Sequence, residues 1–187
     1  MASKVDICNL ALTQLGADRI VAIDEDSENA RKMNAVYTRI LRSTLRKHPW
    51  NFACKEVTLA TLAETPVIDD YTYVFQLPSD FIRLVKTDLA ETDDYKILGR
   101  KIYSNESTLK IKYVYYVEDP NEYDDLFTDT LAARLAAELA FSISGDKALA
   151  KLANDIYRDK LREAKTIDSQ EETPDQLTAN EWLDARE

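Results

Sequence analysis

The amino-acid sequence predicts an α+β fold, in which a four-helix bundle (two N-terminal and two C-terminal helices) carries an inserted small antiparallel β-domain and an extended C-terminal tail. Apolar residues recur every three to four positions before residue 50 and again after Pro120, which indicates amphipathic helices. Between these regions the period changes to two, which indicates half-buried strands. The expected divisions are 1–50 and 120–168 for the two halves of the bundle, 51–119 for the β-domain and 169–187 for the tail.

Two helices are expected before residue 50. The first runs from about residue 4 to residue 15, and Gly16 stands where a left-handed C-terminal residue is expected. Ser27 is the expected N-cap of a second, longer helix, which Pro49 ends. The core stripe of this second helix has the spacing of one helical face: Ala30, Met33, Tyr37, Ile40, Leu41, Thr44 and Leu45.

The β-domain is expected to hold about five strands, because alternating apolar residues recur between turn signals. The expected strands span residues 71–77, 81–85, 95–98, 101–104 and 108–117. Gly99 and Arg100 form a two-residue loop between the third and the fourth strand. Lys110 and Lys112 face away from the apolar side of the last strand.

Two further helices are expected after Pro120. Leu131, Leu135 and Leu139 follow each other at four-residue spacing, and alanines flank them. Such small residues permit close approach, either to a neighbouring helix or to another subunit. Gly145 ends this helix, and Asp146 is the expected cap of the last one.

Composition argues against several classes of protein. The formal charge is −10, so the average surface repels nucleic acid. The three glycines lie far apart, which removes the basis for a phosphate-binding loop. Cys8 and Cys54 fit neither a disulfide framework nor a zinc site, and we expect reduced thiols in a cytosolic protein. We expect no cofactor, no metal, no signal peptide and no membrane-spanning segment.

The sequence shows no catalytic signature, and we expect a protein that is not an enzyme. The single histidine, His48, follows the second helix, where a capping or packing role is expected. Pairs of adjacent acids, such as Asp124 with Asp125, are expected in solvated loops. A carboxylate-dependent cell-wall hydrolase stays open as a less favoured alternative, because its two acids can come from anywhere in the chain.

The second helix carries an unusual run of bases. Between Arg31 and Lys47 there are six basic residues and no acid. Four of them are expected to form a basic stripe opposite the apolar face: Lys32, Arg39, Arg42 and Arg46. The stripe is compatible with nucleic-acid phosphate, with an acidic surface of a neighbouring subunit, or with an ordinary solvated face. We favour the subunit contact because the rest of the chain is acidic.

Several segments, in order, resemble the tail tubular protein A family of podoviruses, the head-to-tail adaptors of short-tailed phages. They are DICNLALTQLG at 6–16, the close of the second helix at 41–53 with HPWNFA, QLPSDF at 76–81, GRKIYS at 99–104 and LAARLAAELA at 131–140. Their order and spacing cover roughly residues 4–165. The shared segments are structural, so the resemblance transfers no catalytic residue.

The resemblance implies a dodecameric ring between the portal protein and the tail nozzle, in a virion assembled in the host cytoplasm. DNA passes through such a ring without sequence-specific binding, and a negatively charged channel suits this passage. The C-terminal segments of the family contact the portal, which suggests that role for Leu177, Trp182 and Leu183. The alternative for this tail is a frayed terminus with no role. The alternative from the residues alone is a nucleic-acid-binding module that uses the basic second helix.

Overall fold

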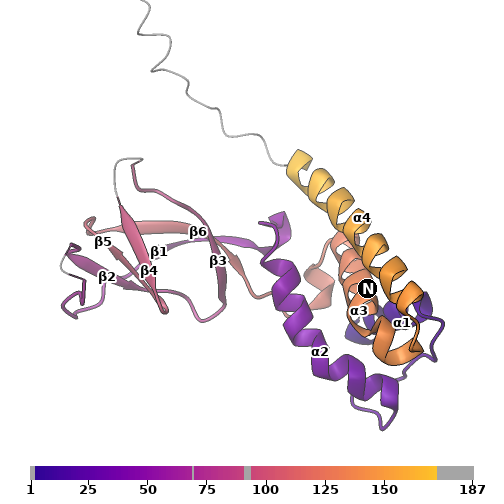
Figure 1. Ribbon diagram of the computed structural model, residues 1–187. Coiled ribbons are helices and arrows are strands. Elements are labelled where there is room, and N and C mark those ends of the chain that lie inside the picture. Colours follow the sequence, from indigo (N-terminus) through magenta and orange to yellow (C-terminus); the bar gives the residue numbers. More distant parts are fainter. Residues whose placement is uncertain (1–2, 69, 91–93, 172–187) are drawn as a thin grey trace, which may run out of the picture.

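The computed structural model describes residues 3–68, 70–90 and 94–171, which form an elongated molecule with helices at one end and strands at the other (Figure 1). The helices of this part are α1 (Lys4–Gln14), α2 (Glu28–Leu45), α3 (Asp125–Ser144) and α4 (Lys147–Glu171). The strands are β1 (Cys54–Leu59), β2 (Tyr73–Gln76), β3 (Phe81–Thr87), β4 (Tyr95–Leu98), β5 (Lys101–Ser104) and β6 (Leu109–Tyr115). Short 3₁₀ helices at Asn51–Ala53 and Pro120–Glu122 join the two regions.

Local signals place the ends of the helices as the sequence predicts. The Ser27 hydroxyl accepts a hydrogen bond from the Ala30 N–H at 3.2 Å and caps α2. Gly145 ends α3 with a φ of 69°, in the left-handed region that favours glycine. The Asp146 carboxylate accepts from the Ala148 N–H at 2.7 Å at the start of α4. These three predictions are confirmed, as is the buried stripe of α2.

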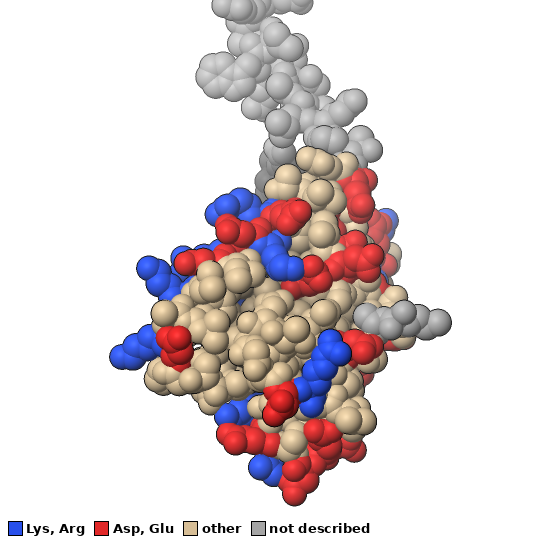
Figure 2. Space-filling model, turned by 90° about the vertical axis from the view of Figure 1, so that its right-hand side faces the viewer, with Lys and Arg blue, Asp and Glu red and all other residues tan. Residues whose placement is uncertain are grey.

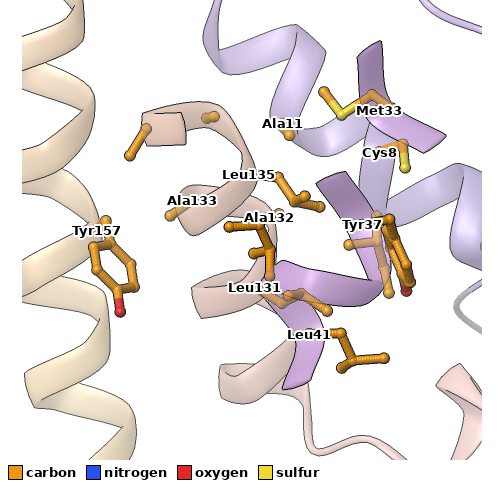
Figure 3. Packing of buried hydrophobic residues seen from close by; sticks show 14 of the residues in the cluster. Cys8, Ala11, Met33, Tyr37, Leu41, Leu131, Ala132, Ala133, Leu135 and Tyr157 are labelled. Atoms are coloured by element: carbon orange, nitrogen blue, oxygen red, sulfur yellow. The ribbon is translucent and has the colours of Figure 1, made fainter. Parts of the chain in front are cut away.

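The predicted four-helix bundle of two helix pairs is wrong. α3 lies at the centre, and α1, α2 and α4 each pack mainly against α3 rather than against one another. In Figure 3, Ala133 lies on the side of α3 that faces Tyr157 of α4, while Leu131 and Leu135 point toward α1 and α2. The sequence predicted that the alanines beside the leucines permit close approach to a neighbouring helix or to another subunit. In the structure these alanines are buried, and α3 packs against three helices rather than one.

The prediction of one small inserted β-domain also needs correction. The described strands form two antiparallel sheets of three strands each, in the orders β1-β6-β3 and β2-β5-β4. Ile82 of β3 and Val114 of β6 belong to the same apolar core as the helices. A second core contains Phe75, Ile102 and Ile111. The fold is therefore α+β, but its first sheet is packed into the helical core.

The hairpin of β4 and β5 has the two-residue loop that the sequence predicts. Leu98 pairs with Lys101, and Gly99 adopts a φ of 62°. The hairpin lies in the strand end of the molecule, away from α4 (Figure 1). No helix within the described ranges is both long and apolar enough to cross a membrane.

The packing of α3 predicts the effect of a larger side chain at Ala136, which is fully buried. Ala136→Leu is expected to lower the free energy of unfolding by about 1–3 kcal/mol, because the added atoms force neighbouring helices apart. Ala148→Leu on the exposed start of α4 is the matched control, with an expected change within about 0.5 kcal/mol. Urea unfolding measures both, and equal effects would contradict the central position of α3.

Candidate interaction surfaces

The single histidine takes part in a polar cluster that joins distant parts of the chain. His48 Nε2 lies 2.9 Å from Asp168 Oδ2, and both side chains are largely buried. Asp168 Oδ1 accepts from the Asn51 N–H at 3.0 Å. The His48 ring packs edge-on against Trp50 at 4.9 Å between centroids. The cluster therefore holds the last turns of α4 against the connection between α2 and β1.

Burial lowers the pKa of His48 below its usual value of 6.5, and this effect outweighs the attraction of the Asp168 carboxylate. The positive charges of Lys165 and Arg83 act in the same direction as burial. His48 is consequently neutral in the folded protein near neutral pH. This arrangement agrees with the predicted packing role, although nothing local in the sequence identified Asp168 as the partner.

The bases of the second helix all have partners within the chain. Lys32 Nζ lies 2.6 Å from Glu28 and donates to the Ser142 carbonyl at 2.8 Å. Arg39 pairs with Glu138 of α3 at 2.7 Å. These bonds join α2 to α3.

The bases at and just after the C-terminal end of α2 contact the strand region and α4. The Arg42 guanidinium lies over the Tyr116 ring, 5.2 Å from its centroid. Arg46 donates to the Ile82 carbonyl of β3, and Lys47 donates to the Tyr157 hydroxyl at 2.7 Å. The stripe therefore helps to hold the fold together. Its role in a subunit contact stays a prediction.

A second group of bases lies on the open face of the first sheet. Lys86, Lys110 and Lys112 line a shallow hollow of about 170 Å³ together with Glu56 and Asp88. Lys110 Nζ lies 2.6 Å from Glu56, and this hydrogen bond lowers the pKa of Glu56. The two carboxylates offset most of the lysine charge. The outward position of Lys110 agrees with the predicted alternation of β6.

Large apolar side chains are exposed at both ends of the molecule. At the strand end, every residue of β4 is exposed, including Leu98 at 53%. At the helical end, Leu152 of α4 is 55% exposed, and Ile156 and Leu10 are also exposed. Figure 2 looks onto the helical end and shows an uncharged centre bordered by acidic and basic residues. The sequence pattern did not single out these surfaces, because it marks apolar positions without showing which of them find a partner.

The candidates for portal contact, Leu177, Trp182 and Leu183, lie outside the described residues. The last described element, α4, ends at Glu171. The portal contact of this segment therefore stays a prediction from the sequence.

The buried histidine makes stability depend on pH. Below about pH 6.5 the unfolded chain binds a proton at His48 that the folded chain binds only at lower pH, so acidification favours unfolding. We expect the wild type to lose more unfolding free energy than His48→Asn between about pH 7.5 and about pH 5.5. Urea titrations at the two pH values measure this. Equal losses in both proteins would show that His48 titrates normally in the fold.

The partners of the basic helix predict unequal effects of removing two of its arginines. Arg46→Ala is expected to cost about 1–2 kcal/mol, because the Ile82 carbonyl loses a charged donor. Arg31→Ala removes only an exposed ion pair with Asp26 and is expected to cost at most about 0.5 kcal/mol. Thermal or urea unfolding of both variants checks the difference. Similar costs would mean that Arg46 does not hold β3 to α2.

Comparisons with known proteins provide no family for this chain. A scan against protein-family models and a search of curated proteins found no match. The resemblance to the tail tubular protein A family therefore depends on the segments quoted above. The function that it implies is a proposal.

Proposed function

We propose that the chain is a non-enzymatic structural subunit of a short-tailed phage, which assembles into a ring between the portal protein and the tail nozzle. The ordered resemblance of its segments supports the identity of the adaptor. The structural observation that favours ring assembly is the exposure of large apolar side chains at two opposite ends of the molecule.

A ring needs two different contact surfaces on each subunit. When one surface of a copy binds the other surface of the next copy, rotation about an axis closes the chain of contacts. β4 provides an apolar surface at the strand end, and α4 provides another at the helical end. Grouped apolar residues on the exterior of a protein mark interaction sites more often than scattered ones do.

The distribution of charge favours passage of DNA over its capture. The chain carries a formal charge of −10, and a ring multiplies that charge. Phosphates are repelled by such a surface unless bases are concentrated on it. The six bases of the second helix, from Arg31 to Lys47, are bonded within the chain to α3, α4, the strands and nearby acids. This arrangement makes the alternative of a nucleic-acid-binding helix less favoured.

The proposal predicts assembly with the portal protein. Purified chain and portal protein, mixed and sized by light scattering coupled to chromatography, are expected to form one complex that contains many copies of the chain. Particles viewed end-on in the electron microscope are expected to show a closed ring. The chain without portal is the reference for its own state of association.

Two results would contradict this function. A chain that stays monomeric at all concentrations, with and without portal, has no ring-forming surface. An open filament of variable length would show that the subunits associate but that their rotation does not close.

A further inference from the structure

The strand end presents an apolar and basic hairpin. β4 is an edge strand that pairs with β5 alone among the described strands. Tyr95 and Ile97 lie on one face of β4, and Leu98 lies on the other. Exposed edge strands with large apolar residues offer both unpaired backbone groups and apolar area to a partner.

The charge of this hairpin is uniformly positive. Residues 95–104 contain Lys96, Arg100 and Lys101 and no acid. Lys101 pairs with Glu64, and Arg100 donates to the Pro78 carbonyl. Lys96 is exposed within β4 itself, between the apolar residues. A partner for this surface therefore combines apolar side chains with carboxylates.

The helical end of the same chain has that combination. Leu152 and Ile156 are exposed at four-residue spacing on α4. Three exposed acids follow Leu152 on the same side of the helix, in steps of three and four residues: Asp155, Asp159 and Glu163. Asp155 and Asp159 form exposed ion pairs with Arg158 at 4.0 Å and Arg162 at 3.2 Å, and such pairs are weak enough in water for the carboxylates to exchange partners. Apolar side chains and carboxylates thus alternate along one flank of α4.

We propose that the hairpin of β4 and β5 in one copy packs on the exposed flank of α4 in the next copy. This flank is defined by Leu152, Ile156 and the three acids of α4. The proposal deepens the ring function and rests on it, because it names the two surfaces that meet at each subunit boundary. Lys96 and Leu98 lie on the same face of β4, so Lys96 then faces carboxylates of α4 while Leu98 covers Leu152 and Ile156.

Pairing of β4 with β4 of a second copy fits the observations less well. Such a contact uses the same surface on both copies, so it stops at a dimer. It also brings two uniformly basic hairpins together, and like charges across an interface disfavour association. The contact between opposite ends joins unlike charges and leaves each copy with one free surface for the next.

Disulfide cross-linking between two variants distinguishes the two contacts. One variant carries Leu98→Cys and the other Leu152→Cys, both with Cys54→Ser, and tags of different length identify each copy. Cys8 is fully buried and stays unchanged. Oxidation of the mixture, under conditions in which the Cys54→Ser parent is oligomeric, is expected to give mainly the mixed dimer. Val67→Cys replaces Leu98→Cys as the control, because Val67 is more exposed than Leu98 (81% against 53%) and lies in neither surface.

The results of this experiment distinguish failure of the proposed contact from failure of the proposed function. If Leu98→Cys links mainly to itself, or if the mixed dimer is no more abundant than the Val67→Cys control, the inference is overturned while ring assembly stands. If the parent is monomeric even with portal protein, the proposed function fails and the inference fails with it.

A charge exchange tests the same contact without cysteines. Lys96→Glu is expected to weaken assembly severalfold, because a carboxylate then meets the acids of α4. Asp155→Lys, Asp159→Lys or Glu163→Lys, introduced into the Lys96→Glu chain, is expected to restore much of the lost assembly. Lys147→Glu, a charge change at the start of α4 outside the row of acids, is the control. Failure of all three exchanges to restore assembly would overturn the contact.

Discussion

The burial of α3 on several sides is the constraint on which the rest of the structure depends. Alanines between its leucines let α1, α2 and α4 approach closely, and each of those helices packs against α3. α4 then covers α3 with Ala153, Tyr157 and Ala164 and leaves Leu152 and Ile156 on its flank. The surface that we assign to subunit contact is thus a consequence of how α3 is covered.

Signals that act within a few residues made part of the fold predictable. Ser27, Gly145 and the loop at Gly99 fix the ends of elements through their own backbone or side-chain chemistry. The arrangement of the helices was not predictable in this way, because a leucine stripe shows one buried face and does not show how many neighbours share a helix. β1 was missed because its burial does not follow a clean alternation.

The candidate surfaces were harder to predict from the sequence than the fold was. The run of bases in α2 suggested a partner outside the chain, but Arg39 finds Glu138 about a hundred positions away. His48 and Asp168 are similarly distant in sequence. Conversely, Leu98 and Leu152 look like ordinary core positions in the sequence, and only the packed structure leaves them exposed. Polar and apolar groups alike acquire their role from long-range contacts.

An acidic subunit with apolar surfaces at its two ends suits a ring through which DNA passes, since the ends meet in the ring while the remaining surface repels phosphate. Hydrogen–deuterium exchange, compared between the free chain and the chain assembled on portal protein, tests this account most directly. The account predicts slower exchange in the assembly at both 95–98 and 148–156. Slower exchange at only one of these segments, or at neither, would contradict it.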